Sequence, residues 1–150
     1  MPGTKAVLSA LPKICGLGEL LLAPPETGSI IAHVGASVCV AGWDPRSRTG
    51  AMLHCVLPSS DLNSFRASSY PAVFADTGLA ALWQALQGLR LEPGALQFHV
   101  AGGAPETVEA VLAFFKEKGL RPDQSHCQGQ ASRKVSLNLQ TGGLSVQREL

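Results

Sequence analysis

The sequence predicts an α+β domain of layered, mostly antiparallel sheets with two main helices. Apolar, strand-like segments fill the first third of the chain, and two later segments repeat apolar residues at helical spacing. A final stretch alternates around a Thr-Gly-Gly turn, which is typical of a closing hairpin. The resulting order of strands, helix, strand, helix and strands favours separate layers of sheet and helix. Because no repeat and no linker divides the sequence, we expect one domain over residues 1–150.

The first third of the chain contains runs of Val, Ile, Leu and Ala bounded by Gly, Pro and polar residues. These predicted strands are residues 14–23, 29–34, 37–43 and 51–57. The polar, Gly-closed connection at residues 44–50 predicts a hairpin with a connection longer than two residues. Residues 59–71 are polar and predict a loop long enough to be mobile or to lie over a site.

Two helices are predicted from apolar residues at i, i+3, i+4 and i+7. The first runs from about residue 71 to 88, and the second begins at Pro105 and ends near Gly119. Their apolar positions are Leu79, Leu82, Trp83 and Leu86 in the first, and Val108, Val111, Leu112 and Phe115 in the second. A short strand at residues 96–101 lies between them, and residues 134–147 form the closing hairpin.

Composition excludes several classes of protein. The 12 basic and 11 acidic residues give a net charge of +1 and form no basic stripe, so nucleic acid is not an expected partner. Apolar runs end well before the roughly 18–20 residues that span a bilayer, and residues 5–11 do not resemble a secretory signal. The four cysteines lack CxxC spacing, which predicts reduced thiols in the cytoplasm and neither zinc nor disulfides. They are Cys15, Cys39, Cys55 and Cys127.

A candidate nucleophile and base lie in the predicted hairpin of residues 34–58. Antiparallel pairing brings Ser37 and Cys39 near His54. Because Ser37 and Cys39 are two residues apart, their side chains point to the same face of a regular strand. Small residues before Ser37 would let a substrate carbonyl approach backbone N–H groups. Short Ser/His pairings are common by chance, and His54 can equally be a packing residue. Cys39 and its counterpart Cys55 can equally be small buried hydrophobic residues.

The remaining polar candidates carry weaker signals. Gly102 and Gly103 either let a backbone approach a ligand or only turn the chain. Arg133 is either an exposed strand cap or the partner of a carboxylate or carbonyl. Three other histidines lack metal-ligand spacing, so no metal is expected: His33, His99 and His126.

Several of these motifs resemble the CheD family of chemoreceptor glutamine deamidases over most of the chain. The most specific is Gly-Ala-Met-Leu-His-Cys-Val-Leu-Pro at residues 50–58, which resembles the family's histidine strand. The others share the family's order along the chain: Gly-Leu-Gly-Glu at 16–19, Phe-Ala-Asp-Thr at 74–77, Ala-Gly-Gly-Ala at 101–104, Val-Glu-Ala-Val at 108–111, and Gly129, Arg133 and Thr-Gly at 141–142.

The resemblance implies an α/β sandwich related to the cytotoxic necrotizing factor deamidases. The implied activity is hydrolysis of a protein glutamine side chain to glutamate, with release of ammonia and without a cofactor. In the family a cysteine attacks the amide, a histidine activates it and a threonine completes the site. The histidine corresponds to His54, whereas the cysteine falls on Ser37 and the threonine on Ile31. The family's longer segment after Gly-Gly-Ala is nearly absent, because Pro105 starts the helix at once.

Three hypotheses follow from these departures. The chain is a deamidase that uses Ser37 and His54, or Cys39 after a register shift. Alternatively, it is a pseudoenzyme, a CheD-like regulatory protein that binds chemoreceptor helices or a CheC-type phosphatase. A third hypothesis is a structural relative that holds a different ligand in the same cleft.

Overall fold

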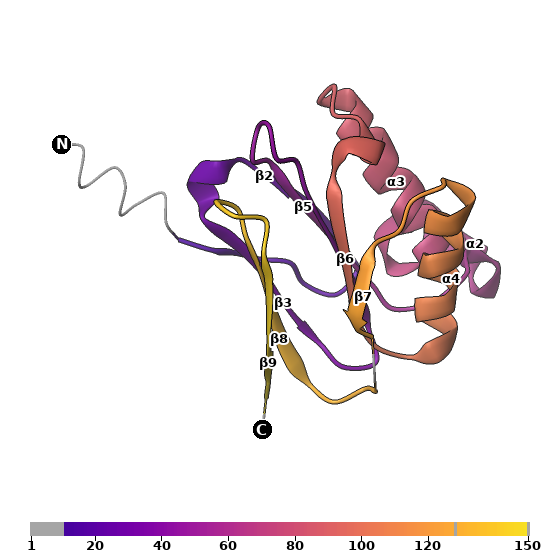
Figure 1. The fold of residues 1–150 in the computed structure, drawn as a ribbon. Coiled ribbons are helices and arrows are strands. Elements are labelled where there is room, and N and C mark those ends of the chain that lie inside the picture. The colour runs from indigo at the N-terminus through magenta and orange to yellow at the C-terminus, as the bar shows by residue number, and fades with distance from the viewer. Residues whose placement is uncertain (1–10, 128, 150) are drawn as a thin grey trace.

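The computed structural model describes residues 11–127 and 129–149, which form two sheets and one layer of helices (Figure 1). The first sheet has the order β1-β3-β8-β9, and the second has the order β2-β5-β4-β6-β7. The second sheet lies in the middle, with the first sheet on one face and the helices on the other (Figure 1). The sequence predicted no secretory signal in residues 5–11, and nearly all of this segment lies outside the described residues.

The elements follow the predicted alternation of strands and helices. The strands are β1 (Lys13–Ile14), β2 (Glu19–Ala23), β3 (Ser29–Val34), β4 (Val38–Trp43), β5 (Gly50–Cys55), β6 (Gln97–Gly102), β7 (Asp123–His126), β8 (Arg133–Asn138) and β9 (Leu144–Arg148). The helices are α2 (Ser64–Ser69), α3 (Ala75–Gly88) and α4 (Pro105–Glu117). Short 3-10 turns are η1 (Pro25–Thr27), η2 (Ser60–Leu62), η3 (Pro71–Val73) and η4 (Pro93–Ala95). No helix in the described ranges is long and apolar enough to cross a membrane.

Most strand pairs are antiparallel, as predicted. Strands β4 and β5 form the predicted hairpin, in which Cys39 lies opposite His54. Strand β2 adds to the far side of β5, and β6 adds to the far side of β4. The parallel pairs are β1 with β3 and β6 with β7. The mostly antiparallel α+β sandwich with two main helices is therefore confirmed.

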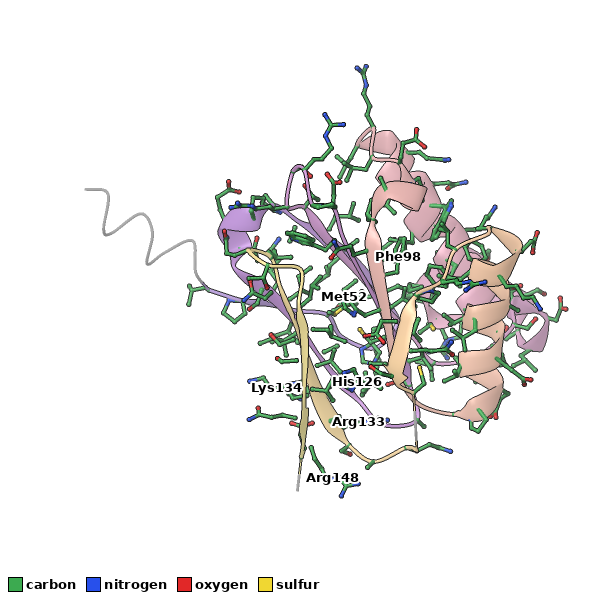
Figure 2. The ribbon with its side chains drawn as sticks, in the orientation of Figure 1. Met52, Phe98, His126, Arg133, Lys134 and Arg148 are labelled. Carbon is green, nitrogen blue, oxygen red and sulfur yellow. The ribbon has the colours of Figure 1, made fainter. Side chains whose placement is uncertain are left out.

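The middle sheet separates two hydrophobic cores because its side chains alternate between its faces. Val40 and Leu53 pack with Phe98 against α3 and α4. Cys39 and Met52 pack between the two sheets, and Figure 2 labels Met52 there. His54 lies two residues beyond Met52, so its side chain belongs to the same inter-sheet face.

Four sequence expectations about elements were wrong in detail. The single strand at 14–23 is interrupted because Gly18, with φ +73°, turns the chain before β2. The predicted loop at 59–71 contains η2 and α2. The start of α2 is capped by the Asn63 side chain, which accepts a hydrogen bond from the Arg66 amide. The helix expected from residue 71 begins at Ala75, after the Pro71–Val73 3-10 turn. Strand β7 was missed because its polar residues show no apolar alternation.

One hydrogen bond joins the two sheets at the end of β4. The indole Nε1 of Trp43 donates to the Leu139 carbonyl at 2.8 Å, and both residues are buried. Trp43→Phe leaves that carbonyl without its donor, so we expect the free energy of unfolding to fall by about 1–3 kcal/mol. Urea denaturation followed by circular dichroism measures this change. An unchanged midpoint would show that the bond does not contribute to holding the sheets together.

Candidate active site

Ser37 and His54 meet at one end of the space between the sheets. Ser37 directly precedes β4, and His54 is the fifth residue of β5. The Ser37 Oγ lies 2.7 Å from the His54 Nε2, and the two residues are only 8% and 2% exposed. The proximity that the hairpin predicted is therefore present in the structure.

The second ring nitrogen of His54 determines the direction of that hydrogen bond. Nδ1 lies 3.1 Å from the Cys15 carbonyl oxygen, which can only accept a hydrogen bond. The proton of a neutral imidazole therefore belongs on Nδ1, and Nε2 accepts from the Ser37 hydroxyl. Burial lowers the pKa of His54, although the backbone partner Cys15 acts in the opposite direction. The site thus holds a neutral base aimed at a hydroxyl.

The corner that carries Ser37 is held by the end of β6. A Cβ on Gly102 would collide with the Ser37 carbonyl oxygen, and one on Gly103 with the carbonyls of Ala36 and Ser37. The amide of Ala104 donates to the Ala36 carbonyl at 2.7 Å. Of the two roles considered for the glycine pair, the structure shows close backbone approach, but to the protein's own Ser37 segment.

Cys39 is the register partner of His54, yet it belongs to the core. Its side chain is 1% exposed within the inter-sheet cluster. Burial raises the pKa of the Cys39 thiol well above its ordinary value, and the neighbouring thiols Cys15 and Cys55 add to this effect. A protonated thiol in this environment is a poor nucleophile. The 2.7 Å contact of Ser37 with His54 and the burial of Cys39 therefore support Ser37, not Cys39, as the group beside the base.

Cys55 also behaves as a buried hydrophobic residue. It lies in the helix-side core, and burial raises the pKa of its thiol to about 12. Its Sγ donates to the Val38 carbonyl at 3.6 Å, on the face of β5 that is directed away from His54.

The position that the family resemblance gives to a threonine holds no side-chain partner for His54. Ile30 and Ala32 pack between the sheets, so the alternation of β3 directs Ile31 to the opposite face. The backbone of Ile31 is nevertheless close to the site, because its carbonyl accepts from the Cys15 amide at 2.7 Å. The second ring nitrogen of His54 therefore contacts the peptide carbonyl of Cys15 and not a threonine side chain.

Two of the other histidines have hydrogen-bond partners of their own outside the Ser37–His54 pair. His33 contacts Glu149 at 3.0 Å on the surface, and His99 Nε2 lies 3.1 Å from the Gly142 carbonyl. Within the described ranges, no three His, Cys, Asp or Glu side chains gather in a way that could hold a metal.

Arg133 organises the segment that precedes β8. It donates to the carbonyls of Ala131 at 3.0 Å, His126 at 3.0 Å and Gly129 at 2.8 Å (Figure 2). It is 9% exposed, so the exposed strand cap is wrong and the carbonyl partner is correct. The backbone of this segment reaches the corner that carries Ser37, because a Cβ on Gly35 would contact the Gln130 carbonyl at 3.4 Å.

Sequence reasoning missed two contributors, Cys15 and Glu19. Cys15 precedes the turn before β2 and contacts His54 through its carbonyl, and Glu19 is the first residue of β2 and lies opposite His54 in the β2–β5 register. The Gly-Leu-Gly-Glu motif at residues 16–19 was the available signal, but it indicated only the family resemblance and no role at the site.

Comparison with known proteins identifies the family of the chain. The family model described as CheD chemotactic sensory transduction matches residues 56–148, which is more than half of the chain. The chain belongs to the CheD family. The matched segment of this CheD protein begins just after His54, so it does not by itself assign roles to Ser37 and His54.

Individual relatives cover most of this CheD chain. A protein of Anaeromyxobacter dehalogenans named "Probable chemoreceptor glutamine deamidase CheD 2" is 37% identical over 145 residues, covering 88% of this chain and 91% of its own. A protein of Symbiobacterium thermophilum with a corresponding name is 31% identical over 147 residues, covering 87% and 88%. The chemoreceptor glutamine deamidase CheD of Thermotoga maritima is 28% identical over 147 residues, covering 91% of each chain.

Proposed function

We propose that this CheD protein deamidates glutamine side chains on the cytoplasmic helices of chemoreceptors, with Ser37 as nucleophile and His54 as base. The observation that supports this proposal is the 2.7 Å contact between the Ser37 Oγ and the unprotonated Nε2 of His54. The names of its relatives supply the substrate class, a chemoreceptor glutamine.

The reaction follows from the arrangement of these two side chains. The Ser37 Oγ forms a bond to the amide carbon while its proton moves to Nε2 of His54. His54 then returns that proton to the departing nitrogen, which leaves as ammonia and gives a glutamyl ester on Ser37. A water molecule, deprotonated by His54, adds to the ester carbon and releases glutamate, and the proton returns to Ser37. The net reaction consumes one water and produces one ammonia.

A CheD-like binding protein is the second candidate function. A serine hydroxyl is far less acidic than the thiol that the family resemblance implies at this position, and it depends on its base at the moment of attack. The side chain of Ile31 also supplies no hydroxyl where the resemblance implies a threonine. In this alternative the chain binds chemoreceptor helices, or a CheC-type phosphatase, without modifying them.

Mass spectrometry of a receptor fragment separates the two functions. Purified protein is incubated with the cytoplasmic fragment, and each glutamine peptide is examined for the one-dalton increase to glutamate. We expect conversion by the wild type and none by His54→Ala, while the control Ser68→Ala, an exposed serine on α2, keeps the wild-type rate. Retained binding with no conversion by the wild type would overturn the deamidase and favour the binding protein.

The pH dependence of the rate tests His54 as the base. Burial lowers the pKa of His54 below the ordinary value of 6.5, so the ring stays neutral and able to accept a proton below that pH. We therefore expect the acid limb of the kcat/KM profile to fall below pH 6.5. An acid limb at or above pH 6.5 would contradict this assignment.

A further inference from the structure

A carboxylate lies one peptide unit away from His54. The Glu19 Oε1 accepts a hydrogen bond from the Gly16 amide at 2.6 Å. That amide shares its peptide group with the Cys15 carbonyl, which accepts from Nδ1 of His54 at 3.1 Å. The continuous series therefore runs from Glu19 through the Cys15–Gly16 peptide to the imidazole and on to the Ser37 hydroxyl.

The intervening peptide is fixed by its neighbours. The Cys15 amide donates to the Ile31 carbonyl at 2.7 Å, which ties the turn to β3. The Gly18 amide donates to the backbone carbonyl of His54 itself at 2.7 Å, and the Glu19 amide donates to the Gly16 carbonyl at 3.1 Å. The peptide group consequently has little freedom to rotate away from the ring.

We propose that Glu19 is a positioning residue for His54 and acts through the Cys15–Gly16 peptide. The proposal rests on the proposed deamidase function and extends it to a residue outside the Ser37–His54 pair. A carboxylate that accepts from the N–H end of a peptide polarises the group and makes its carbonyl a stronger acceptor. The stronger acceptor holds the proton on Nδ1, keeps Nε2 toward Ser37 and stabilises the imidazolium formed during attack. In Ser-His-Asp enzymes the aspartate does the same by direct contact.

The electrostatic surroundings of His54 are consistent with this role. The Glu19 charge raises the pKa of His54, whereas His33 lowers it, and both effects are smaller than that of burial. The thiols of Cys15 and Cys39 have pKa values raised by burial, so both are neutral and add no charge near His54. Since Glu19 is exposed, water screens its charge, and orientation through the peptide is its main contribution.

Two substitutions separate the charge of Glu19 from its hydrogen bond. Glu19→Gln keeps an oxygen that can accept from Gly16 but removes the charge, and Glu19→Ala removes both. We expect kcat to fall about tenfold in Glu19→Gln and about a hundredfold in Glu19→Ala, by analogy with the loss found when the hydrogen-bond partner of a metal-ligating histidine is removed. The matched control is Glu26→Gln, an exposed residue in η1 beyond the opposite end of β2. Its kcat should equal that of the wild type.

Nitrogen-15 NMR of the histidine rings tests the same proposal without any activity. We expect His54 to titrate at lower pH in Glu19→Gln, because a charge that raises its pKa is gone, and to lose its Nδ1–H preference in Glu19→Ala. In the wild type, the Gly16 amide proton should shift both when His54 titrates and when acid protonates Glu19. The role of Glu19 would be overturned if the titration and tautomer of His54 were identical in the wild type, Glu19→Gln and Glu19→Ala, or if the Gly16 amide signal did not change when His54 titrates. If these signals behave as expected but the wild type deamidates nothing, the proposed function fails and the positioning role of Glu19 stands.

Discussion

Ser37→Ala is expected to abolish glutamine hydrolysis, with a fall in kcat of up to about 10⁶-fold. That magnitude is the loss measured in subtilisin when one member of a nucleophile–base pair is removed. The physical reason is that the Ser37 Oγ is the group hydrogen-bonded to Nε2 of His54, whereas the Cys39 thiol is buried and protonated. The measurement is the rate of glutamate formation in receptor peptides, followed by mass.

Matched variants make this result decisive. Cys39→Ala removes the nearby thiol and should leave the rate within a few-fold of the wild type, because Cys39 only fills the core. Ser37→Cys replaces the hydroxyl by a group that ionises far more readily beside a histidine, so we expect a faster reaction. A wild-type rate in Ser37→Ala would exclude Ser37 as nucleophile. If Ser37→Cys were active and the wild type inactive, the result would instead support a pseudoenzyme whose site lost activity through the serine.

Gly103→Ala is expected to disrupt the site from the neighbouring strand end. Its Cβ would collide with the carbonyls of Ala36 and Ser37, which are backbone atoms and cannot rotate aside. We expect the free energy of unfolding to fall by about 1–3 kcal/mol, as in other overpacked sites. The displaced Ser37 should also lower kcat by about a hundredfold, since a shift near 1 Å has that effect on reacting groups.

The control for this substitution is Gly88→Ala at the end of α3. A Cβ there has no heavy atom within 4 Å, so the same chemical change meets open space. Thermal unfolding and the deamidation rate should both remain close to the wild type. If Gly103→Ala behaves like Gly88→Ala, the close approach of β6 does not hold the Ser37 corner.

Local patterns predicted much of the fold because they report which faces are buried. Helical spacing located α3 and α4, and the Gly-closed polar connection located the β4–β5 hairpin that brings Ser37 to His54. The same reasoning failed for α2 and β7. Helix α2 is short and buries only Ala67, and β7 consists of polar residues, so neither shows a periodic apolar face.

The sequence by itself indicated the family, the layered fold class and His54 as the candidate base, with Ser37 or Cys39 as the candidate nucleophile. Only the tertiary structure decided which hydroxyl or thiol contacts His54, because Ser37 and Cys39 share a strand face and differ only in their place along it. Only the tertiary structure brought Cys15 and Glu19 to the ring, since β2 joins β5 through a pairing between residues 35 positions apart in the chain, Glu19 with His54. Sequence patterns describe neighbours along the chain, whereas the partners of His54 are determined by packing between strands.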